Sequence, residues 1–554
     1  MNKLISLFIF FFCLNSFGQN MHLKITGASE NQIKVIDSIG YEKSFSNAKG
    51  IFDEGKLFSE KLMKDGFLEH RIIESKKEND STFLLRYDLG KKTNFIHIYI
   101  GKDLDKKYWD SYTIKNDTLM LVFSESEVFL NSLLKKLESN GFSMSKVKLE
   151  NIFIKNNYVS ANLKINYDKK REVNDIVING YDKFPEGHKK NLKRLYRKRI
   201  FNQQNLDKLY KDIEQYRFVK QTKYPEILFT KDSTRIFVYL EKAKANSFDG
   251  FIGFSNDENK NVIFNGYLDL SLSNILNSGE KLALYWKSNG EDQKTFNLGI
   301  ELPYVFKSPF GLKAQLNIFK QDSTFQNTQT TIDLGYYFNY NTRLYLGYQS
   351  GESSDIKNLN TSTLSDYTNK FFTTNFEYIN FKNNNYLFSE KSNYNLKIGV
   401  GKRDSKFQTN NQFYGNVNLK HNFYLNDKNV INIKSQNFYL QSEEYIINEL
   451  YRFGGINSIR GFNENSLQAT AFSSILTEYR YIISSNIYAH SIIDYGYFQD
   501  KTSNVNGNLL GLGFGFGLLT KNGLFNLVYA NGSTKEQAIK FSNSIVHISL
   551  KASF

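Results

Sequence analysis

The stretch NVIFNGYLDLSLSN, residues 261–274, decides the fold of this chain because its apolar and polar side chains alternate. Apolar residues of one parity are interleaved with polar ones, as shown by Val262, Phe264, Leu268, Leu270 and Leu272 against Asn265, Asp269 and Ser271. Successive side chains of a β-strand point to opposite faces. A period of two therefore predicts a strand with one apolar and one polar face.

The same pattern continues to the C-terminus, for example in KLALYWKS (281–288), TFNLGIELP (295–303) and SIVHISLKASF (544–554). Sixteen such runs begin near residues 248, 261, 280, 294, 311, 326, 341, 369, 393, 410, 429, 469, 485, 508, 522 and 543. An even number of strands is typical of bacterial outer-membrane barrels. Closure is needed because an open sheet edge in lipid leaves backbone groups unpaired. We predict a 16-stranded antiparallel transmembrane β-barrel over residues 248–554, with a soluble β-sandwich as the alternative.

The composition fits an exported membrane barrel. Aromatic residues make up 16% of the chain, proline occurs 4 times, and the mean hydropathy is −0.47. Alternating strands line a polar lumen and so keep the average hydropathy low. The formal net charge is +15. In an exported protein, this charge favours anionic lipid head groups as partners over nucleic acid.

The N-terminus predicts a secretory signal peptide over residues 1–18. Lys3 precedes an apolar stretch from Leu4 to Leu14, and small residues Ser16 and Gly18 follow. Spanning a bilayer takes about 20 apolar residues, so this stretch is too short for an anchor. The only cysteine, Cys13, lies inside it. The mature chain is therefore expected to have no disulfide, thiolate metal site or cysteine nucleophile.

The first half contains an internal repeat. Three short strands end in glycine, LKITG at Gly27, FIHIYIG at Gly101 and DIVING at Gly180, and each is followed by helix-period segments and two further strand-like runs. This order predicts three two-layer α+β modules, over residues 19–92, 93–170 and 171–247. Small sheets with exposed edges can bind extended peptide by strand addition, while a spacer role is the alternative. The third module carries the basic segment HKKNLKRLYRKR (188–199), which is a solvated helix face or contacts anionic lipid.

The segment YRFGGINSIRGFNEN, residues 451–465, interrupts the strand pattern. With the modules on the periplasmic side, the connection between the eleventh and twelfth strands starts outside. Its glycines allow the loop to approach the wall of a polar lumen, where a buried arginine requires an anionic partner. The residues we single out are Gly454, Gly455, Arg460, Gly461 and Phe462 in the loop and Glu478 and Asp494 in the next two strands. Arginine can bind a carboxylate with two parallel hydrogen bonds, and Phe462 can pack beside the guanidinium.

The combination resembles the BamA/TamA-like family of outer-membrane assembly and translocation barrels, also called bacterial surface antigens. Arg460, Gly461 and Phe462 match the core of the family's loop motif, with Ile459 where the family often has valine. Asp494 matches its acidic strand position, and Glu478 fits the glutamate of the preceding strand. The modules resemble polypeptide-transport-associated (POTRA) domains, and Phe554 resembles the barrel-assembly signal. The resemblance implies a sixteen-stranded barrel with the arginine loop tucked into its lumen.

The family implies a function in the outer membrane, with the modules in the periplasm receiving unfolded outer-membrane or secreted polypeptides for insertion or translocation. Implied partners are outer-membrane lipid and lipopolysaccharide, and possible ones are assembly lipoproteins or an inner-membrane protein. Three modules are fewer than the five usual in the main insertase and more than the two of two-partner secretion pores, so the exact role stays open. The alternative is a passive pore, which would conduct small solutes and tolerate deletion of residues 21–245.

The sequence predicts no enzymatic activity. It has no nucleophile elbow, no motif of paired catalytic carboxylates and no His-x-x-x-His spacing, and its 7 histidines are scattered. We accordingly expect no cofactor, no metal site and no nucleic-acid partner.

Overall fold

The structure is a computed structural model that describes residues 20–101, 108, 112–155, 158–256, 262–289, 293–382, 387–521, 523–536, 538–539 and 544–554. The predicted signal peptide, residues 1–18, lies outside these ranges. The described residues form two compact units, one of residues up to 172 with 200–204, and one of residues 173–199 with 205–554. The third predicted module thus shares a unit with the predicted barrel. None of the described helices is long and apolar enough to cross a membrane.

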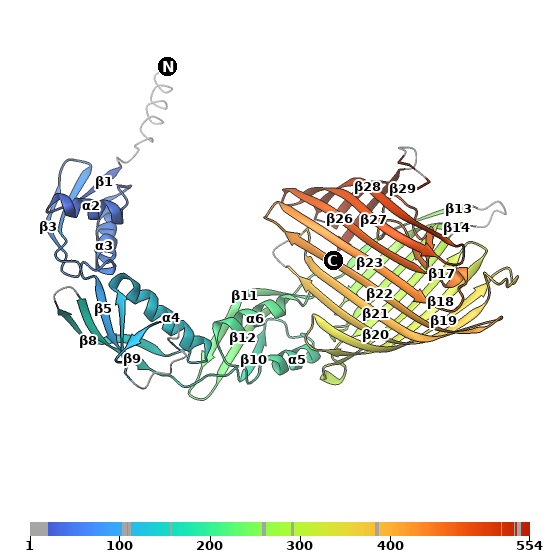
Figure 1. Cartoon of the computed structure of the whole chain (residues 1–554), viewed down its shortest axis with the longest axis horizontal. Coiled ribbons are helices and arrows are strands. Elements are labelled where there is room, and N and C mark those ends of the chain that lie inside the picture. Colours follow the sequence, from blue (N-terminus) through green and yellow to red (C-terminus); the bar gives the residue numbers. More distant parts are fainter. Residues whose placement is uncertain are drawn as a thin grey trace, which may run out of the picture. The chain divides into compact units, whose positions relative to one another are not determined.

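The first module is a four-stranded sheet covered by two helices (Figure 1). Its elements are β1 (Met21–Gly27), α2 (Glu30–Ile39), β2 (Ser44–Phe45), α3 (Ala48–Lys64), β3 (Arg71–Lys77) and β4 (Thr82–Asp88), with sheet order β2-β1-β4-β3. Helix α3 begins after Asn47, whose side chain accepts a hydrogen bond from the Gly50 amide. Phe58 of this helix packs edge-on against Tyr87 of β4 in the module's core.

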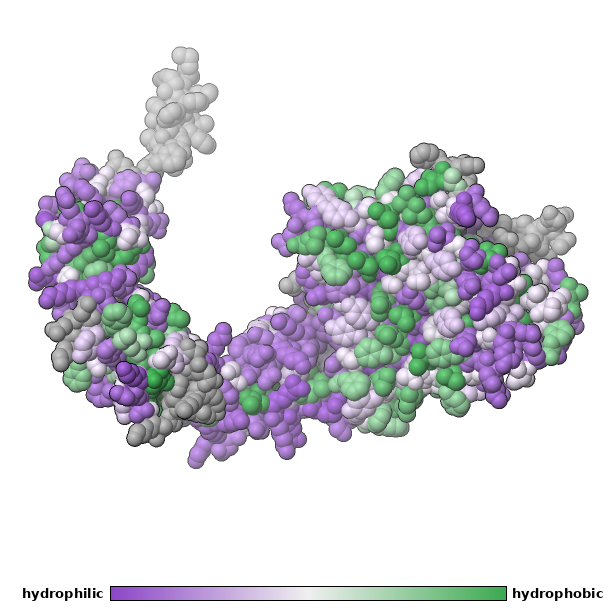
Figure 2. All heavy atoms as spheres, in the orientation of Figure 1, coloured by the Kyte–Doolittle hydropathy of each residue, from purple (hydrophilic) through white to green (hydrophobic). Residues whose placement is uncertain are grey.

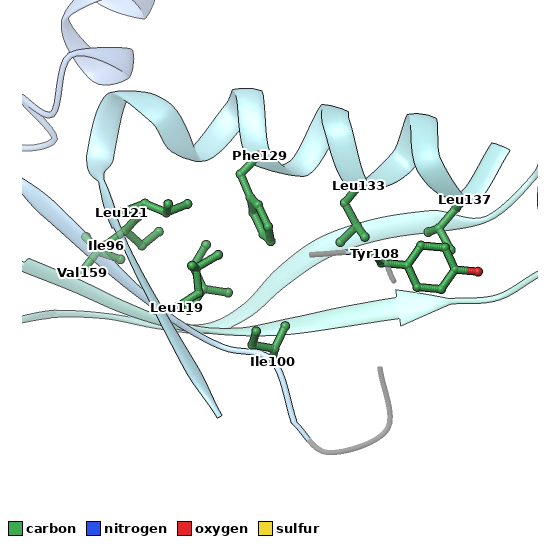
Figure 3. Packing of buried hydrophobic residues seen from close by; sticks show 10 residues of the cluster. Ile96, Ile100, Tyr108, Leu119, Leu121, Phe129, Leu133, Leu137 and Val159 are labelled. Carbon is green, nitrogen blue, oxygen red and sulfur yellow. The ribbon is translucent and has the colours of Figure 1, made fainter. Parts of the chain in front are cut away.

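The second module has a five-stranded sheet with order β6-β7-β5-β9-β8. Its elements are β5 (Phe95–Tyr99), β6 (Ile114–Lys115), β7 (Thr118–Val122), η2 (Phe123–Glu125), α4 (Ser126–Ser139), β8 (Lys146–Lys155) and β9 (Tyr158–Asn166). Figure 3 shows Phe129, Leu133 and Leu137 of α4 pointing down onto the sheet. These side chains recur every three to four residues, so they share one face of the helix.

One part of this module differs from the predicted repeat. Where a helical region was expected after the first strand, residues 114–122 form the hairpin of β6 and β7. Asn116 and Asp117 have φ values of 52° and 56°, as in the two-residue turns that suit hairpins. In the run TLMLV that follows, Leu119 and Leu121 are buried whereas Met120 and Val122 are exposed, which is the alternation of a strand.

The third module combines a three-stranded sheet with two helices. Its elements are β10 (Asp175–Asn179), α5 (Glu186–Tyr196), α6 (Gln203–Glu214), β11 (Val219–Phe229) and β12 (Thr234–Lys242), with sheet order β10-β12-β11. Leu206, Leu209 and Ile213 of α6 are buried, as are Ile236 and Val238 of β12. The module therefore has its own apolar core between the helices and the sheet.

Sixteen antiparallel strands close into a barrel (Figure 1). They are β13 (Ser247–Asn256), β14 (Val262–Ser273), β15 (Lys281–Asn289), β16 (Gln293–Leu302), β17 (Phe310–Gln321), β18 (Phe325–Tyr337), β19 (Thr342–Asp355), β20 (Tyr367–Phe381), β21 (Glu390–Ser405), β22 (Thr409–Tyr424), β23 (Asn429–Gln441), β26 (Ala471–Ser484), β27 (Ile487–Asp500), β28 (Val505–Thr520), β29 (Gly523–Thr534) and β30 (Ile545–Ser553). The start sites deviate from the prediction by three residues at most, at Glu390 against 393 and Val505 against 508. The predicted fold class is confirmed.

The two faces of the barrel wall differ as the alternation predicts. On β18, Ile332 and Leu334 are 59% and 52% exposed, whereas Asp333 between them is 2% exposed. Figure 2 shows apolar side chains spread over the outside of the barrel strands. Inside, Arg343 is buried and forms ion pairs with Glu301 and Glu377. The outside is thus suited to lipid, and the inside contains paired charges.

Candidate functional site: the luminal loop

The candidate site is the connection of residues 442–470 between β23 and β26, which we call the luminal loop. It contains the short helix η4 (Ile447–Glu449) and a hairpin of β24 (Tyr451–Phe453) and β25 (Leu467–Ala469). The third module contacts turns that join an even-numbered barrel strand to the next odd-numbered one, such as the turn between the fourth and fifth strands, β16 and β17. The luminal loop joins the eleventh strand to the twelfth, so it starts at the opposite end of the barrel. Its contacts, described below, are with inward-facing residues of the wall.

Arg460 is bound to Asp494 of β27 through three hydrogen bonds. Its backbone amide and Nε donate to Asp494 Oδ2 at 3.0 and 2.7 Å, and its Nη2 donates to Oδ1 at 2.5 Å. Arg460 is 5% exposed and Asp494 is 0% exposed. A desolvated ion pair is tolerated when its hydrogen bonds are well satisfied, and this planar pairing satisfies both carboxylate oxygens.

Glu478 of β26 extends this pair into a network. Arg460 Nη1 donates to Glu478 Oε1, while Arg480 Nε and Nη2 lie 2.7 and 2.5 Å from Glu478 Oε2. His490 Nδ1 lies 3.9 Å from the same oxygen. Two arginines thus balance two carboxylates, which reduces the cost of burying these charges in the wall.

Glycines let the loop backbone lie directly on the wall. Gly461 has a φ of +88°, and a Cβ built there would lie 2.2 Å from the Gly532 amide nitrogen of β29. A Cβ on Gly511 of β28 would lie 2.4 Å from the Arg460 carbonyl oxygen. Any larger residue at either position would push the loop away. Gly454 and Gly455, with φ values of +105° and +94°, shape the turn that precedes the arginine.

An apolar cluster lies beside the ion pair. Ile459 is fully buried, and its Cδ1 would lie 2.2 Å from a Cβ built on Gly496 of β27. Phe453 stacks on Phe472 of β26 with ring centroids 4.1 Å apart. Phe462 packs against this cluster, and among the described residues no cation–π contact joins it to Arg460. The loop therefore binds the wall through apolar packing as well as charge.

A second set of contacts anchors the start of the loop to other strands. Glu449 of η4 pairs with Arg403 of β21 at 2.5 Å, and both side chains are almost fully buried. The Asn448 side chain donates to Ser353 Oγ of β19 at 2.7 Å and to the Ser365 carbonyl at 2.8 Å. Sequence reasoning missed these residues, because nothing in the local pattern marks them as partners.

The far side of the loop reaches the early strands. Glu464 accepts hydrogen bonds from Lys287 and from Tyr285, both of β15, the latter at 3.2 Å. Lys434 of β23 donates to the Asn457 carbonyl oxygen. The luminal loop thus contacts strands on several sides of the barrel and occupies part of its lumen.

The terminal strand brings Phe554 beside the first barrel strand. The Phe554 amide donates to the Asn246 carbonyl oxygen at 3.0 Å, and the phenylalanine side chain is exposed. In the sheet, Ser553 lies opposite Ser247 and Ala552 opposite Phe248. Within the described ranges, no cluster of three His, Cys, Asp or Glu side chains is arranged as a metal site.

Comparison with known proteins gives structural likenesses only. No protein-family model matches the chain, and no curated protein matches it. CdiB from Escherichia coli superposes with a TM-score of 0.51 at 12% identity over 90% of this chain and 97% of its own. CdiB from Acinetobacter baumannii gives 0.51 at 13% identity over 83% and 90%. BamA from Haemophilus ducreyi lacking POTRA domains 1-3 gives 0.47 at 15% identity over 82% and 98%. The sheet order of the chain and its likeness to the two CdiB structures show the fold that the sequence resemblance implied, modules followed by a sixteen-stranded outer-membrane-type barrel.

Proposed function

We propose that this protein is an outer-membrane barrel that inserts or translocates polypeptides, with its modules in the periplasm receiving an unfolded client. The observation that carries the proposal is the weak seam of the barrel. Strand β13 pairs with β14 along its whole length, from Ser247 opposite Ser271 to Asn256 opposite Val262. Within the described residues of the two strands, it shares only two residue pairs with β30.

A weak seam gives a client strand a route into the membrane. Unpaired backbone groups at a sheet edge in lipid are costly, so an incoming strand that pairs with β13 or β30 is stabilised there. Burial of the client's apolar face in lipid then contributes roughly 25 cal/mol per Å². No nucleotide or metal is required for such a step.

The second module supports the reception of extended peptide. Its edge strand β8 carries consecutive exposed apolar residues, Ile152, Phe153 and Ile154. Asn151, with a φ of 51°, marks an irregularity where the register with β9 shifts. An edge strand with free backbone groups and apolar side chains can bind an extended chain by strand addition. Assembly lipoproteins or an inner-membrane partner would use the same periplasmic modules.

A passive pore is the alternative, and the luminal loop argues against it. The loop is attached to β15, β19, β21, β26 and β27 by hydrogen bonds and ion pairs. Such a buried connection occupies part of the lumen that a small solute would have to cross. Conductance in planar bilayers is therefore expected to be small.

The test is a reversible bond across the seam. The chain has a single cysteine, Cys13, inside the predicted signal peptide, so the double variant Phe248→Cys/Ala552→Cys introduces one pair opposite each other in β13 and β30. The matched control is Leu302→Cys/Leu312→Cys, which joins β16 to β17 at a pair already held in a long ladder. Insertion of an unfolded outer-membrane barrel client into vesicles that contain each variant is measured before and after oxidation.

We expect oxidation to abolish client insertion by the seam variant and reduction to restore it, while the control stays active in both states. Equal client insertion by the oxidised and reduced seam variants would remove the seam from the mechanism. Solute efflux from the same vesicles, high in the wild type and insensitive to oxidation, would favour the pore.

A further inference from the structure

A basic cleft lies where helix α5 of the third module meets the turn between β16 and β17. The turn is held against the helix by Asn191, whose side-chain amide donates to the Ser308 carbonyl oxygen at 2.9 Å. A Cβ on Gly187 would lie 3.0 Å from Tyr304 Cβ, so helix and turn are in close contact. The cleft between them has a volume of about 610 Å³.

Five cationic side chains line this cleft: Lys190, Lys193, Arg194, Arg197 and Lys307. Lys193 is paired with Asp175 at 2.6 Å, and Arg194 donates to the Tyr337 carbonyl oxygen at 3.2 Å. Within the part of the chain that the structure describes, no carboxylate lies within ion-pair distance of Lys190, Arg197 or Lys307. Like charges gathered this closely repel one another unless an anion binds between them.

The turn that closes the cleft also carries an unusual aromatic residue. Phe306 is 96% exposed. Tyr304, Phe306 and Lys307 all have φ values in the left-handed region, at 57°, 53° and 59°. Such a backbone is costly for non-glycine residues and is typical of binding sites. The turn therefore carries the exposed Phe306 ring and the Lys307 side chain at adjacent positions.

The outer surface of the barrel beside this turn is aromatic. Phe310 begins β17 and contacts Tyr336 of β18 edge-on at 5.5 Å, and Tyr336 contacts Phe338 at 5.1 Å. Phe310 and Phe338 are exposed, and apolar Leu312 and Leu334 follow along the same outer face. Aromatic girdles of this kind mark the level of the lipid head groups on membrane barrels. The cleft is therefore at head-group level.

We propose that the cleft binds the phosphate of an anionic phospholipid in the leaflet on the module side of the barrel. Lys190, Arg197 and Lys307 bind the phosphate, and Phe306 inserts between the acyl chains next to the aromatic girdle. An acidic segment of a client polypeptide could satisfy the cations but has no use for an exposed ring at the membrane boundary. Bound lipid would tie the third module to the membrane as well as to the barrel.

The test compares two charge-matched variants of the full chain in nonionic detergent. Lys190→Gln/Arg197→Gln/Lys307→Gln removes three exposed cations of the cleft, and Lys220→Gln/Lys231→Gln/Arg235→Gln removes three exposed cations elsewhere on the same module. Native mass spectrometry measures the binding of phosphatidylglycerol, with phosphatidylcholine, inorganic phosphate and a polyglutamate peptide as separate probes. Heat modifiability on gels checks that each barrel is folded.

We expect the wild type and the control to bind one phosphatidylglycerol in preference to phosphatidylcholine, and the cleft variant to bind it roughly tenfold or more weakly. Phe306→Ala should weaken lipid binding and leave inorganic phosphate binding unchanged. Equal phosphatidylglycerol affinity in both triple variants would overturn the proposal. A second result would also overturn it: inorganic phosphate or polyglutamate competes with phosphatidylglycerol, and Phe306→Ala does not change phosphatidylglycerol binding. The site would then accept a free anion or an acidic peptide.

Discussion

Arg460 and Asp494 each depend on the other for their charge. Both are almost wholly removed from water, and three hydrogen bonds join them. Two of these come from the guanidinium and one from the loop backbone, so the pairing fixes both the side chain and the path of the loop. Glu478 adds a contact to another strand. A single residue thereby couples the luminal loop to β26 and β27.

Replacing this arginine by glutamine should destabilise the barrel. Arg460→Gln leaves Asp494 as a buried carboxylate without its cation, and breaking a buried pair costs about 3–5 kcal/mol. We expect a lower urea midpoint for barrel unfolding in vesicles, with Arg235→Gln on the exposed surface of the third module as the control. Asp494→Asn in the same chain should recover part of the loss, because the orphaned charge is removed. An unchanged midpoint for Arg460→Gln would contradict the structural role of the pair.

His188 predicts a pH dependence at the contact between the third module and the barrel. Burial, and after it the nearby charge of Lys281, lower the pKa of His188 to about 3. Tyr216, Tyr304 and Tyr340 surround the ring. An unfolded histidine titrates near 6.5, so between about 6.5 and 3 the unfolded state binds a proton that the folded state does not. Stability is full above this range and is lost as the pH falls through it.

The measurement is hydrogen exchange of residues 173–245 at pH 7.5 and pH 5.0, corrected for the intrinsic pH dependence of exchange. We expect weaker protection at pH 5.0 in the wild type, with a slope of up to about 1.4 kcal/mol per pH unit. His188→Leu keeps the apolar packing and removes the titrating group, so its protection should vary less with pH. A wild type and a leucine variant with the same pH dependence would show that another group is responsible.

At the level of elements, the luminal loop is fixed to the barrel wall at several places. Its start is anchored through Asn448 and Glu449 to β19 and β21, and its middle through Arg460 to β26 and β27. The two strands of the hairpin, β24 and β25, lie on either side of Arg460 in the sequence, and the hairpin packs on Phe472. Releasing one anchor should loosen the loop without unfolding the barrel.

Asn448→Ala tests the first anchor alone. It removes the hydrogen bonds to Ser353 and the Ser365 carbonyl and leaves the Arg460 pair intact. We expect faster hydrogen exchange over residues 442–458 and more frequent current steps in planar bilayers, at a cost of about 1–3 kcal/mol for the partners left unsatisfied. Asn506→Ala, at an exposed position of β28, is the control. Exchange at wild-type rates would mean that the remaining contacts, including those of Glu449 and Arg460, hold the loop without Asn448.

The elements predicted best from the sequence are those with a local signal. A strand buried on one face alternates with period two, so each barrel strand could be located independently. The loop arginine and the two carboxylates that it contacts were named because they occur in a recognisable motif. Arg403 and Glu449 were not, since their pairing depends on how the barrel closes. The glycine row of β28, Gly511, Gly513, Gly515 and Gly517, was also overlooked, although it leaves room for the loop and for wall side chains.

In the second module, the internal repeat led to a wrong prediction. The repeat predicted a helical region where the structure has the β6–β7 hairpin. Similarity to the neighbouring modules outweighed the local evidence of an Asn-Asp turn. Local turn chemistry was the better guide there, because a two-residue turn with positive φ fixes the hairpin irrespective of the repeat.

At the level of the whole molecule, the third module is bound to the barrel by specific contacts. Gln215, which directly follows α6, accepts a hydrogen bond from the Phe381 amide at 2.8 Å and donates one to the Phe381 carbonyl at 3.2 Å. The Asn274 side chain donates to Tyr181 OH at 2.9 Å, and His188 packs edge-on against Tyr304 at 4.8 Å. The contacts involve several turns at one end of the barrel. The module and the barrel should therefore be stable together.

Two truncations test this unity. A chain without residues 20–167 keeps the ion pair of Asp168 with Arg171 and every contact of the third module with the barrel, so we expect heat modifiability and urea resistance equal to those of the full chain. A chain without residues 20–245 exposes Tyr304 and Tyr340, both at most 6% exposed now, and leaves the Phe381 backbone groups without Gln215. That barrel should unfold at a distinctly lower urea concentration or assemble poorly. Equal urea resistance of both truncated chains would mean that the third module does not stabilise the barrel. The contacts of His188 and Gln215 would then serve only to orient the module.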